Sequence, residues 1–244
     1  MKFIDKYNIL ISNQYGFRKG PSTSYALIDL FEKITTAIDN KETTIGLFLD
    51  LSKAFDTVNH NILFDKLEHY GIRGSTLDLI KSYFANRQQF FQYNEHCSNY
   101  QEITCGVPQG SILGPLFFLL YMNDINVVSK IINLILFADD TNVFFSHNNL
   151  NSLIDTLSIE TAKLTDWFVA NKLSLNLKKT NFMIFKPRQR KISEVKLSIN
   201  NQKINCVEQT VFLGVRLDSD LSWNSHISYV ANKISKSIYN ISNI

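Results

Sequence analysis

The amino-acid sequence predicts an α+β fold in which helices pack on one face of a sheet. Short runs rich in β-branched and aromatic residues are typical of strands, and they occur at 44–50, 131–145, 181–186 and 211–217. Segments with apolar residues at helical spacing predict helices at about 22–40, 60–70, 75–85, 115–123 and 150–171. With 244 residues and 45% hydrophobic content, the chain can bury a substantial core, as one large domain or two small ones.

The first predicted helix, 22–40, follows a Pro-Ser-Thr-Ser segment that can cap its first turn. Its apolar residues recur on one face: Ala26, Leu27, Leu30, Phe31, Ile34 and Ala37. The strand that comes next ends abruptly at Asp50 and is followed by the polar pair Ser52 and Lys53. A buried strand that ends on a carboxylate is typical of a chain leaving a sheet to form a site. A role for Asp50 as the cap of a following helix stays open.

The run from 131 to 145 contains two adjacent carboxylates, Asp139 and Asp140, between apolar residues. The pattern predicts two short strands joined by a tight turn with both carboxylates at its tip. Desolvating two carboxylates is costly unless a cation or hydrogen bonds compensate them. A plain Asp-Asp turn is the alternative at this point. If the two strand ends converge, Asp50, Asp139 and Asp140 could hold magnesium, which prefers oxygen ligands.

Composition excludes several classes of protein. Cys97, Cys105 and Cys206 form no C-x-x-C pair, so neither a zinc site nor a disulfide framework is indicated. The longest apolar stretches are too short to span a bilayer, and no signal-peptide pattern is present. We therefore expect an intracellular protein, nuclear or cytoplasmic, without a membrane partner.

Charge is distributed unevenly along the chain. Residues 163–244 contain 13 Lys and Arg against 5 Asp and Glu, whereas residues 1–162 contain 12 against 17. The basic segment 163–244 is densest at 186–191, Lys-Pro-Arg-Gln-Arg-Lys, which could contact a phosphate backbone or form a solvated loop.

Three segments occur in a diagnostic order: Leu49-Asp50-Leu51-Ser52-Lys53-Ala54-Phe55-Asp56, then Gly106-Val107-Pro108-Gln109-Gly110 continuing through Ser111-Ile112-Leu113-Gly114-Pro115, then Phe137-Ala138-Asp139-Asp140. Together they resemble the reverse transcriptase of non-LTR (LINE) retrotransposons, most closely of jockey-like elements. The resemblance begins near Gln14-Tyr15-Gly16-Phe17-Arg18-Lys19-Gly20 and continues through Phe212-Leu213-Gly214 to the C-terminus. It implies a polymerase palm with partial fingers over 1–217 and the start of a truncated thumb helix over 218–244.

The resemblance also implies roles for single residues. Asp50 and Asp139, with Asp140 beside them, would bind two Mg²⁺ ions, with Mn²⁺ as a possible substitute. Lys179 would protonate the pyrophosphate leaving group or offset its charge, although a solvated surface lysine is the alternative.

Substrate contacts follow from the same resemblance. Phe55 would exclude the ribose 2′-hydroxyl, unless it is only a core aromatic. Leu51, Gln109 and Gly110 would line the substrate site, although the glycine-rich segment could be only a loop. Phe212, Leu213 and Gly214 would form the turn that grips the primer, unless they are an ordinary strand with a glycine bend.

The resemblance predicts an RNA-directed DNA polymerase that acts on an RNA template, a DNA primer and deoxynucleoside triphosphates, as a fragment of a retrotransposon polyprotein. An upstream Arg-Pro-Ile-Ser-like fingers motif is missing, and we do not assign its role to Arg18 or Lys19. A non-catalytic nucleic-acid-binding remnant is therefore the alternative, and another palm-type nucleotidyl transferase or cyclase is a more distant one. The sequence defines no oligomeric state.

Overall fold

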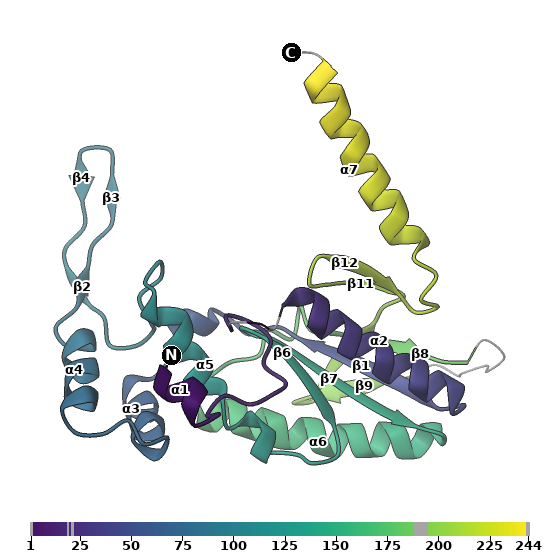
Figure 1. Cartoon of the computed structure of the whole chain (residues 1–244), viewed down its shortest axis with the longest axis horizontal. Coiled ribbons are helices and arrows are strands. Elements are labelled where there is room, and N and C mark those ends of the chain that lie inside the picture. Colours follow the sequence, from purple (N-terminus) through teal and green to yellow (C-terminus); the bar gives the residue numbers. More distant parts are fainter. Residues whose placement is uncertain (1, 19, 21, 188–194, 243–244) are drawn as a thin grey trace.

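A six-stranded sheet forms the centre of the molecule in the computed structural model, which describes residues 2–18, 20, 22–187 and 195–242 (Figure 1). Its strand order is β6-β7-β1-β8-β10-β9. The strands are β1 Thr43–Leu49, β6 Asn133–Phe137, β7 Asp140–His147, β8 Asn181–Phe185, β9 Leu197–Ile199 and β10 Gln202–Cys206. The helices are α1 Lys2–Lys6, α2 Thr23–Asp39, α3 His60–His69, α4 Ser75–Phe84, α5 Leu113–Met122, α6 Leu150–Ala170 and α7 Asn224–Ser242, with 3-10 turns at Ala54–Asp56 and Ile125–Val127.

Strand β1 is the central element of the sheet. All seven of its residues are buried, and it pairs antiparallel with β7 on one edge and β8 on the other. Gly46 lies under the ring of Phe144, where an added Cβ would come within 2.7 Å of a ring carbon. The strand is therefore held on both edges and packed tightly above and below.

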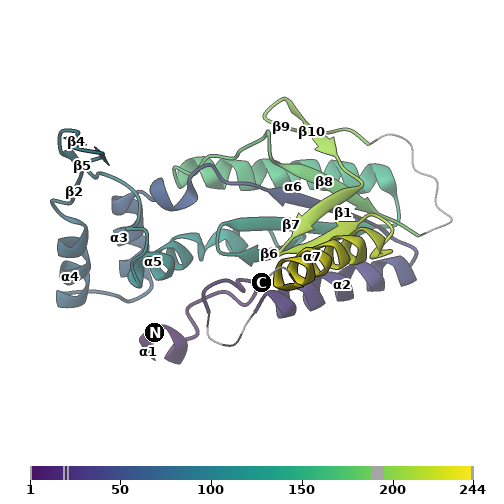
Figure 2. The ribbon, with the colours of Figure 1, turned by 90° about the horizontal axis from the view of Figure 1, so that it is seen from above.

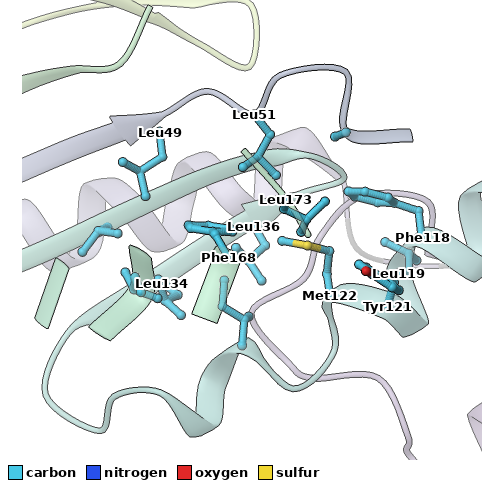
Figure 3. Packing of buried hydrophobic residues seen from close by; sticks show 14 of the residues in the cluster. Leu49, Leu51, Phe118, Leu119, Tyr121, Met122, Leu134, Leu136, Phe168 and Leu173 are labelled. Atoms are coloured by element: carbon cyan, nitrogen blue, oxygen red, sulfur yellow. The ribbon is translucent and has the colours of Figure 1, made fainter. Parts of the chain in front are cut away.

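Helices cover both faces of this sheet, which corrects the expectation of helices on one face (Figure 2). Leu47 and Leu49 face a large core built with α3, α5 and α6, part of which Figure 3 shows. Phe48 faces the opposite side, where α2 contributes Ala26, Leu30 and Ile34. Because side chains alternate along a strand and both sets are apolar here, both faces need a cover.

The predicted strand 211–217 is also wrong in its form. The segment forms a separate hairpin of β11 Gln209–Phe212 and β12 Val215–Asp218, with Leu213 and Gly214 as its two turn residues. Both have positive φ, +48° and +84°, as a type I′ turn requires. The hairpin packs over α2 and its side of the sheet.

Two parts project from this body (Figure 1). One is an arm of two short ladders that sequence patterning missed, β2 Gln88–Gln89 with β5 Gln101–Glu102 and β3 Gln92–Tyr93 with β4 His96–Cys97. The other is α7, whose apolar residues Ile227, Ile234 and Ile238 are exposed. Within the described ranges, no helix combines the length and apolar character needed to cross a membrane.

Candidate active site

Asp50 and Asp140 are brought together by the pairing of β1 with β7. The antiparallel register ends with Leu49 opposite Thr141, so continuing it by one pair places Asp50 opposite Asp140. Opposite residues of an antiparallel pair share a face of the sheet, with Cβ atoms about 4.5–5.5 Å apart. The sequence-predicted convergence of two strand ends is thus present in the backbone.

Asp139 lies in the turn of the β6–β7 hairpin. Phe137 pairs with Asp140, which leaves Ala138 and Asp139 as the two turn residues. Ala138 has a positive φ of +57° and Asp139 does not, and these are the φ signs of a type II′ turn. The tight hairpin predicted from the sequence is confirmed, with both carboxylates at its tip.

Negative charge accumulates at this point. The pKa of Asp140 is raised above its ordinary value, first by burial among protein atoms and then by the nearby charges of Asp139 and Asp50. Part of the Asp140 side chain still reaches solvent, which moderates the effect. The three carboxylates therefore repel one another, and a cation between them would relieve that repulsion.

Among the described residues, Lys179 forms an ion pair with one of these carboxylates. Its Nζ lies 3.9 Å from Asp50 Oδ2, and the two side chains are 70% and 37% exposed, so the ion pair is weak. Backbone hydrogen bonds join the segment around Lys179 to the segment around Asp50: Asn176 N donates to Asp50 O at 2.8 Å, and Ser52 N donates to Ser174 O at 2.8 Å. The predicted lysine is thus both exposed and adjacent to the site.

The donor set fits a divalent cation in chemistry, because carboxylate oxygens are the ligands that Mg²⁺ prefers. Its geometry is not that of a ready-made centre. In the part of the chain that the structure describes, no three His, Cys, Asp or Glu side chains lie close enough together to hold a metal ion. The backbone places the three carboxylates at adjacent strand ends, and a bound cation would have to bring their side chains closer together.

Phe55 follows Asp50 by five residues in the sequence. It lies in the 3-10 turn after β1, stacks on Phe118 with ring centroids 4.4 Å apart, and meets the edge of Phe17 at 6.3 Å. Its side chain is half-buried, so it is both a packing residue and partly accessible. Leu51 differs, because its side chain is buried in the core and only its main chain is left for a substrate contact.

The glycine-rich segment 106–110 is bound to the turn that follows Asp50. Gly106 N donates to Val58 O and Val107 N to Phe55 O, each at 2.8 Å, and His60 Nε2 lies 2.8 Å from Gly106 O. Gly106 has a φ of +87°, and an added Cβ would lie 2.8 Å from Asp56 O, so only glycine fits.

Gln109 itself is exposed and donates from Nε2 to Asp56 Oδ1 at 2.7 Å. It borders a cavity of about 720 Å³. The charged and imidazole side chains that line this cavity are Lys53, Asp56, His60, Arg87 and Glu102. Gly110, the other predicted substrate residue, follows Gln109 in an open turn with a φ of +76°.

The β11–β12 turn lies on the same side of the sheet as the carboxylates. Phe212 packs on Phe48 with ring centroids 6.1 Å apart. Because side chains alternate along a strand and Asp50 follows Phe48 by two residues, the side chains of Phe48 and Asp50 point toward the same face of the sheet. Most of the predicted basic run, 188–191, lies outside the described residues.

Sequence reasoning missed Gln14. Its buried side chain binds the backbone of Ala138 in the hairpin turn. The only signal in the sequence was the place of Gln14 in the Gln14-to-Gly20 motif. Its partner, Ala138, is 124 positions away, so no local pattern could reveal the contact.

A mixed sheet backed by helices, with carboxylates at the ends of two adjacent antiparallel strands, is the arrangement of a palm-type polymerase fold. The fold agrees with solved telomerase structures from two Candida species. Apo telomerase from Candida tropicalis, truncated from its C-terminal domain, has a TM-score of 0.59 at 12% identity, covering 89% of this chain and 43% of that one. Telomerase from Candida albicans with an RNA fragment has a TM-score of 0.55 at 14% identity, covering 91% and 35%.

The chain belongs to the reverse transcriptase (RNA-dependent DNA polymerase) family, which it matches over residues 1–217. Two relatives from Drosophila melanogaster are the probable RNA-directed DNA polymerase from transposon X-element, 28% identical over 96% of this chain, and the RNA-directed DNA polymerase from mobile element jockey, 27% identical over 89%. The chain spans about a quarter of the length of these relatives, 26% and 24%. The predicted resemblance to jockey-like reverse transcriptases is confirmed.

Proposed function

We propose that this chain is the RNA-directed DNA polymerase part of a retrotransposon polyprotein. The observation that carries the proposal is the register of β1 and β7, which sets Asp50 opposite Asp140 with Asp139 in the adjoining turn. In the proposed reaction, the primer 3′-oxygen attacks the α-phosphorus of a deoxynucleoside triphosphate. The bond between the α- and β-phosphates breaks, pyrophosphate leaves, and the hydroxyl proton passes to solvent.

Asp50 and Asp139 would hold two Mg²⁺ ions, or Mn²⁺ ions, with Asp140 beside them. When bound, such ions activate the attacking hydroxyl and neutralise charge on the phosphates. Burial and then the charges of Asp139 and Asp50 raise the pKa of Asp140, and this supports the assignment because a bound cation would offset that repulsion. Lys179, 3.9 Å from Asp50, would move to the leaving pyrophosphate and either donate a proton or offset its charge.

The remaining site residues would bind nucleotide and strands. Phe55 would exclude the ribose 2′-hydroxyl, because its ring is held against Phe118 and cannot readily retreat. Gln109, Gly110 and the main chain of Leu51 would line the nucleotide and the RNA template. The Phe212-Leu213-Gly214 turn would contact the DNA primer, since it lies on the same face of the sheet as the carboxylates.

The domain assignment is part of the proposal. Residues 1–217 would be partial fingers and palm, and 218–244 the start of a thumb. Helix α7 supports this division, because in the described chain it packs mainly on β12, including Arg216 against the ring of Tyr229 at 4.4 Å. Limited proteolysis should therefore cut first near residues 219–223. We also propose an intracellular location, nuclear or cytoplasmic, where RNA and deoxynucleotides occur, which cell fractionation would test.

Primer extension tests the function directly. The purified chain is given a DNA primer on an RNA template with Mg²⁺ and deoxynucleotides, beside Asp139→Ala and the control Asp155→Ala, an exposed carboxylate on α6. We expect extension by the wild type and the control, and at least about a thousandfold loss in Asp139→Ala, since metal-ion stabilisation is worth several kcal/mol.

One observation favours the alternative of a non-catalytic nucleic-acid-binding remnant: the described carboxylates do not form a ready-made metal centre. This alternative predicts primer–template binding without extension. If the chain stays inactive even when joined to the upstream segment of a related reverse transcriptase, the polymerase proposal is wrong.

A further inference from the structure

The segment 13–16 runs beside the edge strand β6, up to the turn that carries Asp139. Leu136 N donates to Asn13 O at 2.9 Å and Tyr15 N donates to Leu136 O at 2.8 Å, which makes Gln14 a parallel bridge partner of Leu136. Arg18 stabilises this segment by donating hydrogen bonds to Ile11 O at 2.8 Å and to Gln14 O at 3.2 Å.

The side chain of Gln14 is only 2% exposed, and it binds both backbone polar groups of Ala138. Its Oε1 accepts from Ala138 N at 3.0 Å and from Gly16 N at 2.8 Å, and its Nε2 donates to Ala138 O at 3.3 Å. Buried amides are costly unless paired, so each of these contacts restricts where the turn can lie.

Gly16 allows the close approach that this arrangement needs. A Cβ at this position would lie 2.3 Å from Ala138 N, and real Cβ atoms do not come so near. The backbone of residue 16 therefore lies directly against the turn, and any larger residue would push the two segments apart.

The residue that Gln14 holds is itself in an unfavourable conformation. Ala138 has a φ of +57°, which non-glycine residues adopt rarely and at a cost. Residues in such conformations persist where surrounding contacts over-determine them. Here the surrounding contacts come from Gln14 and Gly16.

We propose that Gln14 is a positioning residue of the polymerase: by holding Ala138 in its left-handed conformation, it sets the turn so that Asp139 and Asp140 face Asp50. This inference rests on the proposed function for its catalytic consequence, whereas its structural part can be tested without activity.

The structural part is tested by amide hydrogen exchange resolved to single residues. Gln14→Met keeps the length of the side chain and removes the hydrogen bonds. We expect the Ala138 amide to exchange at least about fivefold faster, the equivalent of one hydrogen bond, while the amides of β1 and β7 remain as protected as in the wild type. Unchanged exchange at Ala138, or equal loosening of the whole sheet, would overturn the proposal.

Asn123 offers a matched control. It is also buried, and it also binds backbone with both ends of its amide, accepting from Ile11 N at 2.9 Å and donating to Ile9 O at 2.7 Å. Asn123→Leu should lower overall stability without changing the relative exchange at Ala138, because it touches residues 9–11 and not the turn.

The catalytic part is tested by Mn²⁺ binding, followed by electron paramagnetic resonance, and by steady-state kinetics. Gln14→Met should weaken Mn²⁺ binding about tenfold, as loss of outer-shell support typically does, and lower kcat with little change in the KM for nucleotide. Ala138→Gly in the Gln14→Met background should restore part of both, because glycine adopts positive φ without strain.

The two proposals fail in different ways. A wild-type chain that neither binds Mn²⁺ nor extends a primer, even when joined to the upstream segment of a related reverse transcriptase, contradicts the proposed function, while the exchange rate at Ala138 still decides whether Gln14 holds the turn. A wild-type chain that extends primers, with Gln14→Met equal to it in Mn²⁺ affinity and kcat, contradicts the positioning role alone.

Discussion

Gln109 Nε2 donates a 2.7 Å hydrogen bond to Asp56 Oδ1, although the two residues are 53 positions apart. This bond joins the turn after the Asp50 strand to the glycine-rich segment, beside the cavity that both border. This bond orients the amide of Gln109, because it directs Nε2 toward Asp56 and thereby sets the direction from which Oε1 can accept a hydrogen bond from a ligand.

Removing that acceptor should weaken nucleotide binding. Asp56→Ala is expected to raise the KM for deoxynucleotide about fivefold, the value of one hydrogen bond, with kcat nearly unchanged. Asp56→Asn keeps an acceptor oxygen and should restore most of the affinity. Nucleotide titrations at saturating primer–template measure both, and an equal effect of the two substitutions would contradict an orienting role.

The carboxylate cluster should limit stability at neutral pH. The folded-state pKa of Asp140 is raised, so the folded protein binds more protons than the unfolded chain as pH falls toward the ordinary value of 3.8. The penalty is therefore complete above the folded pKa and disappears below the unfolded one. Asp140→Asn should raise Tm by a few degrees at most at pH 7, because solvent screens the partly exposed group, and the difference should shrink as pH falls. Thermal unfolding from pH 7 to 4 tests this, and a difference that grows at low pH would contradict it.

The sugar specificity of the site should depend on Phe55. Phe55→Val replaces the ring that stacks on Phe118 with a smaller side chain. The ratio of ribonucleotide to deoxynucleotide incorporation should then rise about tenfold or more, because steric exclusion of the 2′-hydroxyl is lost. Competition between the two nucleotides in primer extension gives the ratio. Phe64→Leu, another partly buried aromatic of the same core, is the control and should leave the ratio unchanged.

A substitution of Leu213 distinguishes the stability of the β11–β12 turn from its contact with the primer. It has a φ of +48° in a type I′ turn, for which Asn-Gly is the favoured pair. Leu213→Asn should therefore keep or slightly raise Tm, while primer affinity falls several-fold through loss of the apolar side chain. Fluorescence anisotropy with a labelled primer–template measures the affinity. A simultaneous fall in Tm would show instead that the side chain is needed mainly for packing on α2 and its neighbours.

The carboxylates could be predicted because their signals are local. A strand that ends on Asp50 and a hairpin that turns at Asp139 are each visible within a few residues, and the order of the motifs linked them. The interactions of Gln14 with Ala138 and of Asp56 with Gln109 could not be predicted, because each joins segments that only the folded sheet brings together.

Other differences have equally physical causes. The two-residue strands of the arm at 88–102 are too short to show a period of two. Leu213-Gly214 is not a common turn pair, so the residue pattern predicted one strand there, and only the resemblance to reverse transcriptases predicted a turn. Helix α2 was found correctly, but its apolar stripe could not reveal which face of the sheet it covers.

The two sides of the carboxylate cluster differ in their freedom to move. Strand β1, which ends at Asp50, is hydrogen-bonded along both edges, so displacing it would break two ladders at once. Asp139 lies in a two-residue turn at the end of a hairpin whose other strand, β6, is the edge of the sheet. When a cation draws the carboxylates together, Asp50 should act as the stationary anchor, and the displacement should come from the side chains of Asp139 and Asp140, because Gln14 holds the backbone of the turn.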